Sequence, residues 1–137
     1  MSEEKLKAEA RRWYYQALDD LEAGEALLAA CKYAQSCFYA QQAAEKGMKA
    51  VWFLLDLDPW GHSSAKLMRD LPETVKTEFS PFVDKALGLD KFYIPTHYPD
   101  ALADLIPAEA FTRLEAQTAI HHAKAILEKV RTFGELS

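Results

Sequence analysis

The chain has 137 residues, of which 50% are hydrophobic and 27% are charged, and its formal net charge is −5 at pH 7. This length suits one domain with a sizeable core and is too short for two ordinary domains, so we expect a single domain over residues 1–137. The acidic balance argues against a generic basic surface for nucleic acid, although it leaves room for local basic sites.

The N-terminal residues do not have the pattern of a targeting segment. Residues 1–5 (MSEEK) lack the apolar core of a signal peptide, and no apolar run in the sequence has the length that spans a bilayer. We therefore expect a cytoplasmic protein without a membrane partner. Cys31 and Cys37 lie six positions apart, which argues against a disulfide or a metal pair, and both are interpreted as small core or near-core residues.

The first predicted helix covers residues 4–30, where apolar residues recur at spacings of three and four. Tyr14, Tyr15 and Leu18 broaden its apolar surface and leave aromatic area for a loop or a partner subunit to cover. A short joint without proline then leads into the next helix, so the two elements should form an antiparallel hairpin. The predicted core positions are Leu6, Ala10, Trp13, Ala17, Leu21, Gly24 and Leu28.

The second predicted helix covers residues 33–55, and the rest of the chain is organised around it. One face is an apolar stripe that also contains Gln41 and Glu45, and the nearly opposite face consists mostly of small residues around Gly47. A helix that is apolar on two sides is either central in a bundle or shared with a partner subunit. The stripe comprises Ala34, Cys37, Phe38, Ala44, Met48, Trp52 and Leu55, and the small-residue face comprises Tyr39, Ala43, Gly47, Ala50 and Leu54.

Smaller elements follow. We expect a loop over residues 56–62, a short helix over 65–71 capped by Ser63 or Ser64, and a helical segment over 73–86 that Pro81 breaks and Gly88 closes. Residues 91–100 carry two prolines and several aromatic rings, which predicts an ordered loop. Pro107 then opens a last helix that runs to about residue 133 and ends at Gly134.

The predicted fold class is therefore all-α, because the only strand-like cluster, at residues 92–94, is followed by a proline. We expect an antiparallel helical bundle of three long helices plus one or two short helices, with an ordered proline- and aromatic-rich loop before the last helix.

Common catalytic and metal-binding motifs are absent from the sequence. His121 and His122 are adjacent on the last predicted helix, where side chains diverge by about 100°, so a solvated pair is favoured over a metal site. His62 lies at a loop-to-helix junction, where an imidazole either caps the helix or contacts a ligand, and capping is favoured.

Gln41 and Glu45 are more informative, because an amide and a carboxylate within an apolar stripe cost free energy unless each finds a partner. One interpretation is that Glu45 pairs with Lys49 along its own helix, or that both groups bond the backbone of the proline-rich loop. The other is that they shape a polar notch beneath that loop. The first is favoured for Glu45, and the two are even for Gln41.

Three segments resemble the HEPN family, the higher-eukaryote and prokaryote nucleotide-binding domains. They are residues 37–50 (CFYAQQAAEKGMKA), Gly61-His62 before the short helix, and residues 90–101 (DKFYIPTHYPDA), in the family's order, and the likeness spans residues 14–130. The resemblance implies a compact, often dimeric helical bundle, frequently encoded beside a minimal nucleotidyltransferase. It also implies either nucleotide or nucleic-acid binding or metal-independent RNA cleavage.

Two departures from the family favour binding over cleavage. Ribonuclease members carry an Arg followed after four to six residues by a His, whereas Arg113 precedes His121 by one residue too many and no arginine stands at the right distance before His97. Relatives with the YIPTxYPD motif usually have Arg at x, where this chain has His97. A protonated imidazole replaces that permanent charge only in part.

The sequence thus predicts a non-catalytic HEPN protein that binds a nucleotide or nucleic acid, and that partners a minimal nucleotidyltransferase in a toxin–antitoxin-like pair. The alternatives are an endoribonuclease toxin that uses His97 with Lys46 or Lys49, and a purely structural dimerising subunit. We expect a homodimer, no cofactor, no metal and no catalytic residue. The predicted ligand-binding residues are Gln42, Lys46, Lys49, His62, Tyr93, His97 and Tyr98, and the site-shaping residues are Gln41, Glu45 and Asp100.

In this prediction, Tyr93 and Tyr98 offer planar faces on which a base stacks, while the lysines and His97 meet phosphate. Asp100 has the wrong charge to bind an anion and instead holds the loop. The competing interpretation is that the two tyrosines only pack the loop down, with their hydroxyls bonded to Gln41 or Glu45.

Overall fold

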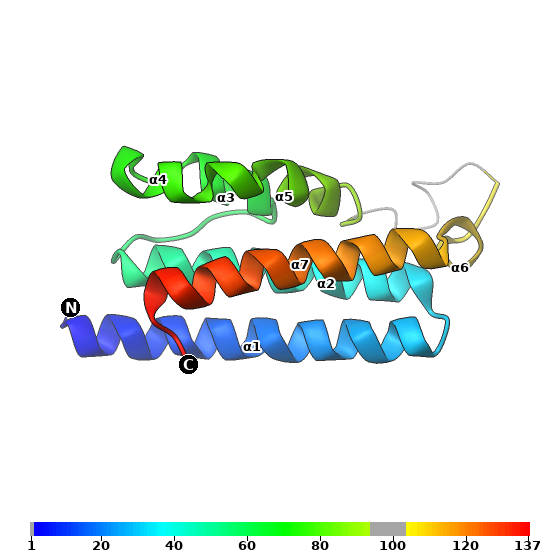
Figure 1. Cartoon of the computed structure of the whole chain (residues 1–137), viewed down its shortest axis with the longest axis horizontal. Helices are drawn as coiled ribbons and strands as arrows, with labels where there is room; N and C mark the ends of the chain where they lie inside the picture. The colour runs from blue at the N-terminus through cyan, green and yellow to red at the C-terminus, as the bar shows by residue number, and fades with distance from the viewer. Residues whose placement is uncertain (1, 94–103) are drawn as a thin grey trace.

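The computed structural model describes residues 2–93 and 104–137, and these residues contain helices and no strands, which confirms the all-α prediction. Figure 1 shows the three long helices side by side, with the layer of α3, α4 and α5 lying over α2 and α7. The long helices are α1 (Glu3–Ala29), α2 (Tyr33–Leu54) and α7 (Arg113–Gly134). The short helices are α3 (Ser64–Arg69), α4 (Glu73–Phe79), α5 (Val83–Asp90) and α6 (Pro107–Ala110), and a 3-10 turn covers Ser80–Phe82.

Helix α1 forms the predicted hairpin with α2. The Ser2 hydroxyl caps α1 by accepting a hydrogen bond from Lys5 N at 3.2 Å. Four of the predicted core positions of α1 are buried and the other three are partly buried: the buried ones are Ala10, Ala17, Leu21 and Gly24, and the partly buried ones are Leu6, Trp13 and Leu28. The expectation of surplus aromatic surface is only partly right. Tyr14 is 4% exposed and belongs to the core, and this burial raises the pKa of its hydroxyl, which the positive charge of Arg131 on α7 offsets in part. Tyr15 and Leu18 are exposed, at 47% and 37%.

Helix α2 is central within its own bundle. Its small-residue face packs on α7, where a Cβ at Gly47 would lie 2.4 Å from Leu127 Cδ2 and one at Gly134 would lie 2.7 Å from Leu54 Cδ1. In these two contacts the residue numbers rise in the same direction along both helices. Helix α7 therefore runs parallel to α2 and antiparallel to α1 (Figure 1). The layer of α3, α4 and α5 makes this possible, since it returns the chain to the end of the bundle where α2 begins.

The last helical region begins at Pro107, as predicted, but it consists of two helices. Phe111 is extended, with φ −107° and ψ 140°, and α7 starts afresh after it. The Thr112 hydroxyl accepts a hydrogen bond from Glu115 N at 3.2 Å, and the Glu115 carboxylate accepts one from Thr112 N at 3.0 Å. This capping box supplies the second helix start, which the apolar periodicity alone did not indicate.

Gly88 does not close the helical segment that begins at Glu73. It lies inside α5, which continues to Asp90, and a Cβ at Gly88 would meet only His122 Nδ1, at an ordinary distance of 3.9 Å. Pro81 does interrupt the segment, because it lies in the 3-10 turn between α4 and α5. Ser63 caps α3 by accepting from Lys66 N at 3.0 Å, which confirms one of the two predicted caps.

Among the described residues, we find no helix long and apolar enough to cross a bilayer.

The two cysteines are both free and differ in environment. Cys37 is fully buried, which raises the pKa of its thiol to about 12. Cys31 is exposed, contrary to the core or near-core interpretation, because it forms the turn between α1 and α2 with a φ of 62°. A hydrogen bond with Tyr33 lowers the pKa of the Cys31 thiol, and the Arg113 guanidinium beside it adds to this effect.

We therefore predict that one thiol per chain reacts quickly with a disulfide reagent at pH 8 in the native protein, and that the second reacts only after unfolding. Absorbance of the released thiolate measures both phases. Cys31→Ser should remove the fast phase and leave the slow one. Equal reaction of both thiols in the folded protein would contradict the burial of Cys37.

Candidate functional site

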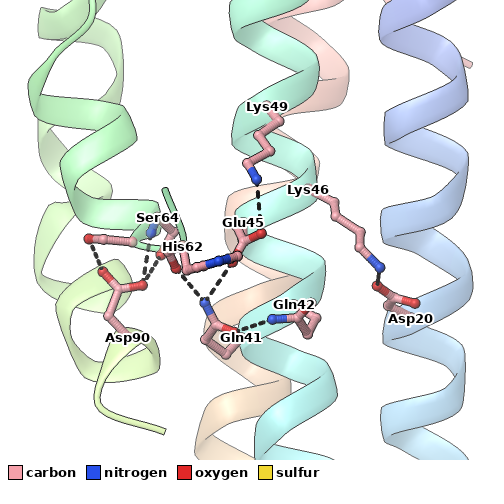
Figure 2. A network of polar contacts seen from close by, with 10 residues as sticks. Asp20, Gln41, Gln42, Glu45, Lys46, Lys49, His62, Ser64 and Asp90 are labelled. Carbon is pink, nitrogen blue, oxygen red and sulfur yellow. Dashed lines mark hydrogen bonds and ion pairs between the residues drawn. The ribbon is translucent and has the colours of Figure 1, made fainter. Parts of the chain in front are cut away.

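A network of polar side chains crosses the middle of α2 (Figure 2). Gln41 is fully buried at its centre. Its amide nitrogen donates to the backbone oxygen of His62 at 2.9 Å, and its amide oxygen accepts from Gln42 at 2.8 Å. Gln41 therefore bonds a loop backbone, as one interpretation expected, and this partner lies in the loop between α2 and α3, while residues 94–100 of the proline-rich loop lie outside the described residues.

Glu45 lies one turn further along α2 and is 4% exposed. One of its carboxylate oxygens is 3.2 Å from Lys49 Nζ, which confirms the predicted pair along the helix, and the other is 3.3 Å from His62 Nδ1. The Lys49 ammonium also lies 5.7 Å from the centre of the Trp13 ring on α1. Lys49 thus neutralises the buried Glu45 carboxylate. A phosphate that binds Lys49 would have to share its ammonium group with Glu45.

His62 does not cap α3, because Ser63 does so. Its imidazole instead stacks on Tyr93, with ring centres 4.8 Å apart and planes at 16°. The Tyr93 ring is 6.2 Å from that of Phe38 on α2. The His62 side chain is 62% exposed, so its imidazole is accessible to solvent beside the buried Gln41 and Glu45.

Asp90, at the end of α5, holds the start of α3 in place. Its carboxylate accepts hydrogen bonds from Ser63 Oγ at 2.7 Å, Ser64 N at 2.8 Å, Ser64 Oγ at 2.8 Å and Ala65 N at 3.0 Å. Tyr93 N in turn donates to the backbone oxygen of Asp90 at 3.2 Å. Asp90 therefore links the segments that carry the two stacked rings, a role that was not predicted from the sequence.

On the other side of α2 lies an ion pair between Lys46 and Asp20 of α1, at 2.5 Å (Figure 2). Asp20 is 5% exposed and also accepts from Gln16 Nε2 at 3.0 Å. Lys46 was predicted from the sequence as a site residue, whereas Asp20 was not. The available signal was an acidic residue beside Leu21, on the buried face of the first helix.

Comparison with known proteins agrees with this architecture. The model of the HEPN domain matches residues 10–133, which is most of the chain. This chain belongs to the HEPN family. The resemblance in residues 37–50 and 90–101 is thereby confirmed at the level of the family.

Solved structures and a curated relative resemble this HEPN chain over nearly its whole length. A protein of Thermus thermophilus is 42% identical, covers 90% of this chain and 96% of its own, and has a TM-score of 0.86. An archaeal HEPN homologue is 30% identical, covers 91% and 97%, and has a TM-score of 0.76. A Methanocaldococcus jannaschii protein named "Putative toxin MJ1304" is 26% identical over 132 residues, which are 90% of this chain and 87% of that protein.

Of the predicted site residues of this HEPN protein, His97, Tyr98 and Asp100 lie outside the described residues. The remaining ones surround the middle of α2 and form two groups. His62 and Tyr93 lie with Gln41 and Glu45 toward α3 and α5, and Lys46 faces α1. Lys49 touches both groups, through Glu45 and through Trp13.

Arg113 and the two histidines of α7 do not form a cluster. The Arg113 guanidinium lies 5.5 Å from the centre of the Tyr33 ring, at the start of α7. His121 follows after two turns of helix, about 12 Å along the axis. The expectation of two solvated histidines is half right: His121 is exposed, but His122 is partly buried in a hollow that Phe92 also lines, and this burial lowers its pKa.

Proposed function

We propose that this HEPN protein binds a nucleotide or RNA and that it forms a toxin–antitoxin-like pair with a minimal nucleotidyltransferase. The observation that carries the proposal is the exposed His62 imidazole, stacked on Tyr93 above the buried Gln41 and Glu45. A base that stacks on aromatic rings gains about 1–3 kcal/mol, and every base has a face suited to this.

Two further observations support the proposal. The relative from Methanocaldococcus jannaschii is named as a toxin, which fits a role in such a pair. Arg113 and His121 are separated by seven intervening residues, whereas the ribonuclease members of the family have four to six, which favours binding over cleavage by this pair. Endoribonuclease activity is therefore the second candidate function.

The test is calorimetric titration of mononucleotides and of short single-stranded RNA into the wild type, His62→Ala and His121→Ala. His62→Ala should weaken binding about tenfold or more, which corresponds to about 1.4 kcal/mol. His121→Ala is the matched control, because it removes an exposed imidazole from α7 and should bind as the wild type does. Lys49→Ala is less suitable, since it also removes the partner of the buried Glu45.

Equal binding by the wild type and His62→Ala would place the ligand elsewhere. If the wild type binds none of the ligands, the nucleotide-binding proposal is wrong, and the pairing with a nucleotidyltransferase has to be tested by itself through co-purification. The alternative, endoribonuclease activity, predicts that the wild type cleaves the RNA in the presence of a metal chelator and that a His97→Ala variant does not.

We also propose a homodimer in solution, as the family resemblance and the exposed apolar residues of α1 suggest. Because Tyr14 is buried in the core, the exposed apolar residues of α1 that were predicted to meet a partner are Tyr15 and Leu18. Light scattering at micromolar concentration should give twice the mass of the chain, and Leu18→Glu should lower it. A monomer under these conditions would contradict the proposal.

A further inference from the structure

We infer that two copies of this chain associate through the outer face of α1, with the two α1 helices antiparallel. This inference rests on the proposed homodimer and specifies its surface and the orientation of the second copy. Helix α1 packs on α2 and α7, and Figure 1 shows it along one side of the bundle. The residues of its outer face recur at spacings of three and four, and all of them are exposed. This outer stripe consists of Lys5, Ala8, Arg12, Tyr15, Asp19, Glu22 and Ala26.

The positive and negative charges of the outer stripe lie in separate halves. Lys5 and Arg12 are in the first half, and Asp19 and Glu22 are in the second. No lysine or arginine stands within four positions of Asp19 or Glu22, so no neighbour on α1 neutralises them. Within residues 2–93 and 104–137, neither carboxylate forms an ion pair. The acidic half of the stripe therefore lacks a cation, which a second chain can supply.

The order of these charges selects one orientation of the second copy. In a parallel pair, each basic half would face a basic half and each acidic half an acidic one, and both contacts repel. In an antiparallel pair, each basic half faces an acidic half, and the two-fold axis provides this contact twice. The stripe is therefore complementary in charge to an inverted copy of itself.

A two-fold axis near Ala17 aligns the outer stripes of the two chains. Arg12 and Glu22 are each five positions from Ala17, so Arg12 lies opposite Glu22 of the partner subunit. Ala8 and Ala26 are each nine positions from Ala17, so they also face each other across the axis. Small side chains at both ends allow the two helices to approach closely, which favours this register.

The centre of the contact is apolar. Tyr15 and Leu18 are 47% and 37% exposed and lie within two positions of Ala17, so the axis brings the pairs from both copies together. The Tyr15 hydroxyl donates to the backbone oxygen of Ser137 at 2.6 Å, which holds its ring on the surface. An apolar centre with charged residues at the rim is the usual arrangement of a protein interface.

Arg12 is free to change its acceptor. Its side chain is 78% exposed, and it pairs at 2.8 Å with Glu9, three residues away on the surface of α1. Exposed pairs of this kind contribute little to stability, so leaving Glu9 costs little. The guanidinium group can bind both oxygens of a carboxylate, which makes its contact with the partner subunit's Glu22 directional.

The test measures the dissociation constant of the dimer by sedimentation velocity for the wild type, Arg12→Glu and Glu22→Arg. Each substitution places two pairs of like charges at the interface and should raise the dissociation constant about tenfold or more. An equal mixture of the two variants should form a heterodimer with a dissociation constant within about threefold of the wild type, because one chain is then acidic and the other basic at both positions.

The matched control is Arg131→Glu, which reverses an arginine in a similar surface pair three residues apart on α7 and should leave the dimer unchanged. Circular dichroism checks that every variant is folded. A wild-type dimer that neither charge reversal weakens, or that Arg131→Glu weakens equally, overturns the α1 surface and leaves the proposed homodimer intact. Variants that weaken the dimer without recovery in the mixture overturn the antiparallel pairing. A wild type that stays monomeric overturns both proposals.

Discussion

Replacing Gly47 by leucine is expected to lower the free energy of unfolding by about 2–3 kcal/mol, because it overpacks the contact between α2 and α7. A Cβ at this position would lie 2.4 Å from Leu127 Cδ2 and 3.7 Å from Val130 Cγ2. Both neighbours are buried core residues and have little room to move. Urea denaturation followed by circular dichroism measures the change.

Gly88→Ala is the matched control for this experiment. Gly88 also lies inside a helix, but a Cβ there would only touch His122 Nδ1 at 3.9 Å. Alanine should therefore stabilise the protein by about 0.5–1 kcal/mol, through its higher helix propensity. An unchanged unfolding midpoint in Gly47→Leu would show that α2 and α7 do not approach each other as described.

Asp90→Ala is expected to cost about 2–3 kcal/mol and to loosen the site. The substitution removes the acceptor of four hydrogen bonds at the start of α3, including both from the buried Ser64. Loss of a helix cap costs about 0.5–2 kcal/mol, and an unsatisfied buried donor costs about 1–3 kcal/mol. These two free-energy costs overlap, so we expect the total loss of stability to lie in the middle of their combined range.

Thermal and urea unfolding measure the stability of Asp90→Ala, and proteolysis of the native protein reports whether the region of α3 opens. Asp84→Ala removes an exposed carboxylate from the first turn of the same helix and should change stability by less than about 1 kcal/mol. Ligand binding by the folded Asp90→Ala variant should fall, since Asp90 links the segments of His62 and Tyr93. Full stability together with full binding would refute the role assigned to Asp90.

The family of this protein and its long helices were predictable from the sequence. Periodicity alone indicated the two apolar faces of α2, and Gly47 within the small-residue face is indeed a point of close helix approach. The pair between Glu45 and Lys49 was predictable for the same reason, because residues four apart on a helix are neighbours whatever surrounds them.

Two other parts of the candidate site, the Lys46–Asp20 ion pair and the hydrogen bonds of Asp90, depend on contacts between residues distant in sequence. Lys46 and its partner Asp20 are 26 positions apart, and Asp90 and Ser64 are also 26 apart. The one local signal was the position of Asp20 beside Leu21 on the buried face of the first helix, and no local pattern distinguishes Asp90 from an ordinary surface carboxylate. Their roles appear only when α1 packs on α2 and α5 packs on α3.

The sequence by itself determined the class of fold, the family and the buried polar residues of α2, because helical periodicity and short motifs are local properties of the chain. The tertiary structure alone decided that α7 runs parallel to α2, that Tyr14 enters the core, and that His62 stacks on Tyr93 instead of capping α3. Each of these depends on which faces meet when the helices pack. That outcome is set by the shape and burial of the whole bundle rather than by the preferences of any one segment.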